Sequence, residues 1–280
     1  MNSIYKYEPC KDPQIDPAIL SIINQHLSKH SATVFEAYDT YVIMSFTWYN
    51  LKSKAKTLKK ISIFLNGQDL LLFIEDTHQL QHYQQLFSEN QKKDHLELLR
   101  LFFNELLGND MEYIDAYETS ITNAEDHALQ DSRKDYLNKI IKFRKQLLHL
   151  KHYYNQLQVI FDGLLENENK YFDDETLRKL TILHDRIDHL QLSVSNLRDY
   201  VTQMREAYQS QIDIEQNHIM KIFTLITAIF LPLTLMVGWY GMNFRYMHEL
   251  NSPYGYPVFI IVSVLVCVLL VFYFKKKRWF

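Results

Sequence analysis

Two long uncharged apolar runs near the C-terminus most constrain what this chain can fold into. They span Ile222–Tyr240 and Val258–Phe274. As helices, both can cross the roughly 30 Å hydrocarbon layer of a bilayer, the second only just. The alternative is two buried helices of a large soluble core, but a cluster of basic residues follows the second run directly, which favours a membrane. The sequence therefore predicts two transmembrane helices, at 222–240 and 258–274.

The distribution of positive charge predicts the orientation of these helices. The tail 275–280 begins with four consecutive basic residues, whereas the loop between the runs carries only Arg245. Cytoplasmic flanks are the ones enriched in Lys and Arg, so the tail is expected inside and the loop 241–257 outside. Because the chain crosses the membrane twice, the part before the first span lies on the same side as the tail, which is the inside. We expect a multi-pass protein of the cell membrane with both termini in the cytoplasm.

The polar N-terminal part, residues 1–172, predicts a small α/β cytoplasmic domain. A helix is expected around Pro17–Lys29. The stretches Thr33–Tyr49 and Leu58–Asp76 are rich in β-branched and aromatic residues, which favour strands, with a hairpin turn at Asn66-Gly67. The fold class expected for the chain is therefore an α+β membrane protein.

Long helices are expected after the sheet, because the only glycine or proline between Gly108 and Pro232 is Gly163. A helix stop is expected at 163–170, and a new helix at Asp173 or Asp174. This helix, the stalk of residues 173–221, continues into the first apolar run without a break. Apolar residues recur along it in alternating steps of three and four, which is typical of a helix packed in a bundle or coiled coil: Leu180, Leu183, Ile187, Leu190, Val194, Leu197, Val201, Met204 and Tyr208.

One face of the first transmembrane helix is weakly polar. Alternating steps of three and four place these residues on it: Asn217, Met220, Thr224, Thr227, Leu231, Thr234 and Gly238. Such a face either packs against another helix or lines a path for water. A single helix cannot enclose a path, so a lining role requires several copies of the chain. The stalk seam offers a means of assembly, and the residues predict a subunit of a homo-oligomeric pore.

The segment that ends the first run resembles a known family. It reads Tyr240-Gly241-Met242-Asn243-Phe244, with Pro232-Leu233-Thr234 upstream and a lysine-rich tail after the second run. Over residues 174–280 the chain is similar to the CorA family of magnesium transporters. The resemblance implies a homopentamer with a cytoplasmic funnel, in which a long stalk helix continues into the pore-lining span.

The resemblance also implies an ion-selective site at Gly241, Met242 and Asn243. Mg²⁺ gives up its water reluctantly, so a ring of neutral carbonyl oxygens that binds the hydrated ion suits conduction better than carboxylates do. Gly241 is expected to permit a sharp turn off the helix. Met220, Phe223 and Leu231 are expected to form an apolar constriction. The outer loop departs from the family in having Arg245, which weakens its attraction for cations.

Two acids on the stalk, Asp185 and Asp188, have two possible interpretations. They lie on a solvated face, or they form a cytoplasmic divalent-cation sensor between subunits, a use that the family makes of stalk acids. The pairs His78/His82 and His149/His152 are spaced to share a helix face. They are either ordinary surface histidines or metal ligands.

No catalytic triad, phosphate loop or dinucleotide fingerprint is present, so we expect no enzyme. A net charge of -3 gives no reason to expect a nucleic-acid partner. No cofactor is expected, with Mg²⁺ as the transported ion and as a regulatory ion. The function predicted is Mg²⁺ uptake down the membrane potential, which supplies about 4.6 kcal/mol per 100 mV for a divalent ion. The alternatives are Co²⁺, Ni²⁺ or Zn²⁺ transport on the same fold, and a membrane-anchored sensor that conducts nothing.

Overall fold

The computed structural model describes residues 2–9, 12, 15–28, 34–49, 58–127, 133–168, 170–242, 247 and 252–277. Its contacts divide the chain into two compact units, Met1–Arg205 and Glu206–Phe280. The division falls inside one long helix, so each unit contains part of that helix.

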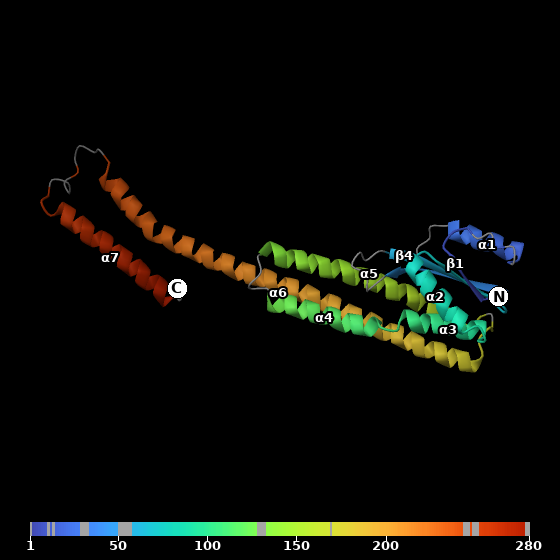
Figure 1. Cartoon of the computed structure of the whole chain (residues 1–280). Coiled ribbons are helices and arrows are strands. Elements are labelled where there is room, and N and C mark those ends of the chain that lie inside the picture. Colours follow the sequence, from blue (N-terminus) through green and yellow to red (C-terminus); the bar gives the residue numbers. More distant parts are fainter. Residues whose placement is uncertain are drawn as a thin grey trace. The chain divides into compact units, whose positions relative to one another are not determined.

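The N-terminal unit is built on a mixed sheet (Figure 1). Its strands are β1 (Asn2–Lys6), β2 (Val34–Tyr38), β3 (Tyr41–Tyr49), β4 (Leu58–Asn66) and β5 (Leu70–Ile74), in the order β1-β5-β4-β3-β2. β1 runs parallel to β5, and the other neighbours are antiparallel. The predicted hairpin is confirmed: Oδ1 of Asn66 accepts hydrogen bonds from the backbone N–H groups of Gln68 at 2.8 Å and Asp69 at 2.6 Å.

Strand β1 is missing from the sequence prediction, which places only one helix in residues 1–30. Of its five residues only Ile4 is buried, so the apolar signal is weak. The strand exists because β5 offers it a parallel edge, with Ile4 opposite Leu72. Such pairing between distant segments leaves no local pattern in the sequence.

Helices cover both faces of the sheet. On one face, α1 (Pro17–Ser28) packs Ile23 and Leu27 against a cluster that includes Ile43 and Phe64 of the sheet. On the other face, α2 (Thr77–Glu89), α3 (His95–Leu106) and α5 (Arg133–Glu166) contact the strands. There the ring of Phe103 in α3 lies 4.9 Å from that of Phe161 in α5 and 6.4 Å from that of Phe46 in β3. Side chains that alternate along β3 thus face opposite sides of the sheet, Ile43 toward α1 and Phe46 toward α3.

The first part of α6 (Asp174–Tyr240) belongs to the N-terminal unit together with α4 (Asp110–Asp126) and α5. The predicted seam is buried here from Leu180 to Met204. Hydrogen bonds join α5 to α6, from Gln158 to Asp188 at 3.0 Å and from Gln191 to Asn155 at 2.6 Å. The seam therefore packs against helices of its own chain. The expectation that it supplies the means of assembly between subunits is wrong for these residues, because they have no exposed surface to offer.

The break between the two long helices lies where it was predicted, but Gly163 does not cause it. Helix α5 continues through Gly163 and ends at Glu166. A Cβ atom on this glycine would lie 2.2 Å from Cε1 of Phe35, so the glycine allows β2 and α5 to pack closely. Helix α6 begins at Asp174. The preceding residue, Asp173, caps it, because its side chain accepts a hydrogen bond from the N–H of Thr176 at 2.9 Å.

The C-terminal unit contains the rest of α6 and α7 (Gly255–Lys276). Both helices are long and apolar enough to cross a membrane, and their apolar windows are not buried in the protein. Helix α6 passes Pro232 and runs unbroken from Asp174 to Tyr240, as the sequence predicts. The rings of Tyr240 and Phe259 meet edge to face at 5.4 Å, which links α6 to α7.

Candidate functional site

The weakly polar face of α6 has a defined hydrogen-bond arrangement. The hydroxyl of Thr224 donates to the carbonyl of Met220 at 2.8 Å, that of Thr227 to Phe223 at 2.6 Å, and that of Thr234 to Phe230 at 2.9 Å. Each hydroxyl has one hydrogen and two lone pairs. Because each hydroxyl hydrogen is already donated within the helix, these side chains can only accept hydrogen bonds from their surroundings.

A groove of about 630 Å³ runs along the same face. It is lined by residues of the predicted stripe and their neighbours: Thr227, Phe230, Leu231, Thr234, Leu235, Gly238, Trp239 and Met242. Apart from the neighbouring residues and backbone of α6 itself, no atom lies within 4 Å of where a Cβ on Gly238 would be, so the hollow is open there. The structure thus brings Thr227, Leu231, Thr234 and Gly238 together on one concave surface.

The three residues expected to form an apolar constriction are all exposed. Met220, Phe223 and Leu231 have 64%, 64% and 69% of their surface accessible. Asn217, at the N-terminal end of the stripe, is exposed too. Apolar side chains on the other faces of this part of α6, such as Ile222 and Val237, are likewise exposed. A helix that exposes this many apolar side chains requires lipid or further protein around it.

At the C-terminal end of α6, the backbone closely approaches Gly241. Its N–H donates to the carbonyl of Val237 at 2.9 Å, and the described glycines have no positive φ. A Cβ on Gly241 would lie 2.9 Å from that same carbonyl oxygen. Close approach of the backbone, and not a left-handed turn, therefore selects glycine here. Met242 follows with 45% of its surface exposed, and Asn243 lies outside the described residues.

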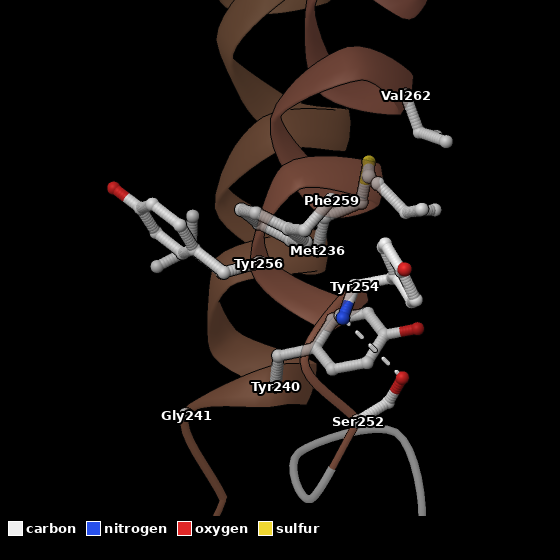
Figure 2. A pocket seen from close by; sticks show the side chains of 11 residues that line it. Met236, Tyr240, Gly241, Ser252, Tyr254, Tyr256, Phe259 and Val262 are labelled. Carbon is white, nitrogen blue, oxygen red and sulfur yellow. Dashed lines mark hydrogen bonds between the residues drawn. The ribbon is translucent and has the colours of Figure 1, made fainter.

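A pocket of about 620 Å³ lies between the C-terminal end of α6 and the N-terminal end of α7 (Figure 2). Tyr240, Tyr254 and Ser252 form its polar end, while Met236 and Phe259 belong to its apolar wall. The N–H of Tyr254 is 3.4 Å from Oγ of Ser252, close to the start of α7. Tyrosines are frequent where a bilayer meets water, so this end of the unit suits that level of a membrane.

The two stalk acids lie in the N-terminal unit beside a histidine. Nδ1 of His184 is 3.8 Å from a carboxylate oxygen of Asp185 and 3.8 Å from one of Asp188. Its Nε2 is 2.9 Å from Asp162 of α5. Both side chains are solvated, Asp185 at 71% and Asp188 at 45% exposed, and among the described residues only Asp188 has a hydrogen bond to α5, which it accepts from Gln158.

These groups do not make a metal site within one chain. No group of three or more His, Cys, Asp and Glu side chains in the described part of the chain is placed to hold a metal ion. Sequence reasoning missed His184 and Asp162. The spacing of His184, one and four residues before the two acids, could have revealed it. Asp162 could not be found in this way, because only the packing of α5 on α6 brings it near.

The histidine pairs have ordinary partners. His82 lies 3.3 Å from a carboxylate oxygen of Glu105, and the ring of His149 stacks on Tyr49 with the ring centres 5.5 Å apart. Burial, together with Lys145 and His152, lowers the pKa of His149. The interpretation as helix-surface histidines agrees with these contacts.

Known proteins resemble the chain over nearly its whole length. A model of the CorA-like Mg²⁺ transporter family matches residues 10–276. The chain belongs to this family. Membership of a transporter family agrees with the expectation that the chain is not an enzyme.

Among its CorA relatives, the cobalt/magnesium transport protein CorA of Thermotoga maritima is 27% identical over 273 residues, which are 95% of this chain and 77% of the relative. The magnesium transport protein CorA of Mannheimia succiniciproducens is 42% identical over 98 residues, 35% of this chain and 31% of the relative. The second alignment thus covers less than a third of that relative.

The CorA fold is also found in solved structures. The complete structure of the CorA magnesium transporter from Methanocaldococcus jannaschii superimposes with a TM-score of 0.77 at 21% identity, covering 95% of this chain and 84% of the other. The predicted fold class, an N-terminal α/β unit with a long helix and a further apolar helix, is therefore confirmed.

Proposed function

We propose that this chain is one subunit of a homo-oligomeric channel that carries Mg²⁺ into the cell down the membrane potential. Copies of α6 surround the pathway, and α7 faces the lipid. Both chain termini lie in the cytoplasm. Family membership supports the class of protein, and the names of its relatives support Mg²⁺ and, as a second cargo on the same fold, Co²⁺.

One observation carries the proposal most directly: the threonine face of α6 offers acceptors only. The outer surface of a hydrated Mg²⁺ consists of water hydrogens, which need acceptors. Thr224, Thr227 and Thr234 have already donated their own hydrogens to α6 carbonyls. Several such faces around an axis would bind the water shell weakly at successive levels, which is the requirement for conduction.

A face used only for packing two helices together would be expected to fit a partner closely. The groove along this face is instead lined by α6 and by Met242 just beyond it, and it remains open in the single chain. It begins at Thr227 and reaches Met242, next to Asn243. We propose that Asn243 provides the ring of neutral carbonyl oxygens that recognises the hydrated ion at the outer mouth.

Subunit contacts must involve surfaces other than the buried seam. Exposed apolar side chains on α6, such as Ile182 and Leu192 at 67% and 58%, are available for this purpose. Asp185 lines a pocket of about 430 Å³ together with Ile182 and His189. We propose that a neighbouring subunit meets this surface and that regulatory Mg²⁺ binds there. The number of subunits expected from the resemblance is five.

Flux through purified protein tests the proposal. The full chain is reconstituted into liposomes that contain a Mg²⁺-sensitive dye, with an inside-negative potential set by K⁺ and valinomycin. Potential-dependent Mg²⁺ entry is expected for the wild type. The Asn243→Leu variant is expected to lose it, since leucine has a similar volume but no carbonyl, while still assembling to the same size in detergent.

The variant Asn251→Leu serves as the matched control, because it makes the same change elsewhere in the outer loop and should conduct normally. Full flux in a correctly assembled Asn243→Leu variant would falsify the proposed selectivity site. Absence of flux in the wild type with Mg²⁺, Co²⁺, Ni²⁺ and Zn²⁺ would instead favour a membrane-anchored sensor.

A further inference from the structure

Helix α4 of the N-terminal unit carries charge of one sign. Its sequence, Asp110–Asp126, contains six acidic residues and neither lysine nor arginine. Asp115, Glu118 and Asp126 lie on one face of the helix, because they are separated by three and eight residues. All three side chains are exposed, and none of them forms an ion pair with another residue that the structure describes. This acidic face of α4 therefore has no basic partner in the described part of its own chain.

Helix α5 has the opposite charge along its first half. From Tyr136 to Lys151 it contains five lysine and arginine residues and no acid. Arg144 and Lys145 are exposed, and neither forms an ion pair among the described residues. Three apolar side chains on the same face are exposed as well: Leu137, Ile141 and Leu148, at 38%, 63% and 46%. An apolar stripe flanked by charges of one sign is typical of a helix face that docks on a surface of opposite charge.

These two faces do not meet within one chain, although α4 and α5 are neighbours. The helices touch through other side chains: the hydroxyl of Tyr117 donates to Oε1 of Gln146 at 2.5 Å. Asp115 and Arg144 are each two residues away from this contact, which places them about 200° around their helices from it. The acidic and basic faces thus point away from the contact between α4 and α5. Surfaces usually intersperse both signs, so this separation calls for a partner outside the chain.

A second copy of the chain, placed by rotation, can bring the two faces together. The contact between α4 and α5 puts Asp115 and Arg144 at the same height along the helix pair. Helix α4 also lies along α6, where the hydroxyl of Tyr200 donates to a carboxylate oxygen of Glu125 (Figure 1). Rotation about an axis parallel to these helices keeps every residue at its height, so α4 of one copy meets α5 of the next at the matching level. A contact between two unlike faces is head-to-tail, the kind that closes into a ring.

We propose that the acidic face of α4 in one subunit docks on the basic face of α5 in the next. This inference rests on the homo-oligomer of the proposed function and adds a contact made by α4 and α5 to it. Asp115 and Glu118 pair with Arg144 and Lys145, and the apolar stripe of α5 is covered by the neighbouring helix. Exposed ion pairs add little affinity, but facing like charges are strongly disfavoured, so the contact fixes which surfaces of two subunits meet.

Chemical cross-linking of the full chain in detergent tests the contact. Cys10→Ser and Cys267→Ser remove the native thiols, and Asp115→Cys and Arg144→Cys are then introduced together. A short bismaleimide is expected to produce a ladder of covalent multimers that ends at the size of the ring, because each chain is linked to both neighbours. Either new cysteine alone should give no ladder. Ser120→Cys combined with Arg144→Cys is the matched control, since Ser120 is exposed about 140° around α4 from Asp115 and should not be linked.

Charge reversal in the cross-linking variant tests the role of charge. Glu118→Lys is expected to lower the yield of the ladder about fivefold, because a lysine would then face Lys145 of the next subunit. Adding Lys145→Glu should restore the yield, a recovery that a folding defect cannot produce. Raising NaCl to about 1 M should weaken the effect of both changes, since exposed charges are then screened.

Three results would overturn the inference: an intact oligomer that gives no ladder, an equal ladder from the Ser120→Cys control, or no recovery of yield in the reversed pair. The size of the protein before cross-linking separates this inference from the proposed function. A monomeric wild type would overturn both the oligomer and this contact. An oligomer of unchanged size without a ladder would overturn this contact alone and leave the basic face of α5 to another anionic partner.

Discussion

Nε2 of His184 lies 2.9 Å from Oδ1 of Asp162, and this contact joins α6 to α5 beside Asp185 and Asp188. The stalk acids are therefore not isolated charges on a smooth helix. Asp188 is tied to α5 through Gln158 as well, so a change in its charge affects the packing of two helices. Any test of the proposed regulatory site has to separate ion binding from this structural role.

Neutralising both stalk acids, as Asp185→Asn with Asp188→Asn, is expected to weaken inhibition by internal Mg²⁺ while transport itself continues. The reason is that bound ions can no longer bridge like-charged surfaces of neighbouring subunits. Asparagine at 188 retains an oxygen to accept from Gln158. The measurement is Mg²⁺ flux in liposomes as a function of the Mg²⁺ concentration on the cytoplasmic side.

The matched control for this test is Asp162→Asn. It disturbs the partner of His184 without touching the two stalk acids, and its inhibition profile should remain that of the wild type. If Asp162→Asn and the double variant shift the profile equally, the acids act through helix packing and the regulatory assignment is wrong.

Leu231→Ser is expected to increase Mg²⁺ leak when internal Mg²⁺ is high. An apolar constriction can block ions by excluding water, and a hydroxyl at this level would keep the pathway wet. Leu233→Ser is the control, because two residues further along a helix lie about 200° around it, away from the groove. Equal leak in the two variants would remove Leu231 from the proposed constriction.

Gly163→Ala is expected to destabilise the N-terminal unit by about 1–3 kcal/mol, as overpacking does. In an unconstrained helix the same change stabilises by about 1 kcal/mol. The difference arises because the new methyl group would meet the ring of Phe35. Thermal unfolding in detergent measures the effect, and the Phe35→Ala background supplies the comparison. There the glycine replacement should become neutral or stabilising, and an unchanged penalty would show that Phe35 is not the obstacle.

Stability should fall as the solution is acidified, in part through His149. The pKa of His149 in the folded protein is below its ordinary value of 6.5, so the unfolded chain binds more protons between these two values. Stability linked to this group is therefore fully present above pH 6.5 and is lost as the pH falls through the folded pKa. Unfolding midpoints between about pH 5 and pH 8 measure it.

His149→Phe keeps a ring against Tyr49 but cannot titrate, so its midpoint should depend less on pH than that of the wild type. His218→Asn, an exposed change in the C-terminal unit, is the control and should not alter the pH dependence. A pH profile identical in His149→Phe and wild type would assign the acid sensitivity to other groups.

Local patterns in the sequence predict much of this fold, and long-range packing accounts for what they miss. Asn66-Gly67 predicts a hairpin because its turn is made by neighbouring residues. The spacing of Leu180 to Met204 predicts a buried helix face, but not whether the partner is the same chain or another. The contact between His184 and Asp162 depends on two helices meeting, and no spacing encodes it.

The candidate ion pathway was predicted in a similar way. Periodicity alone places Thr227, Leu231 and Thr234 on one face, and the structure confirms that they share a groove. The direction of their hydroxyl hydrogens could not be predicted, since threonine in a helix can also bond to water or to a neighbour. The close approach of the Val237 carbonyl to Gly241 could not be predicted either, because it depends on how the helix ends.

The bonding of the threonines has a consequence for the sign of the ions that the proposed pathway accepts. Water around a cation points both hydrogens outward, whereas water around chloride donates one hydrogen to the ion and presents its lone pairs and one hydrogen outward. A wall of threonine oxygens whose hydrogens are already used accepts from the shell of a cation throughout, but it faces lone pairs as well as hydrogens in the shell of an anion. Such a wall can therefore distinguish anions from cations through the orientation of their water, without a formal charge of its own.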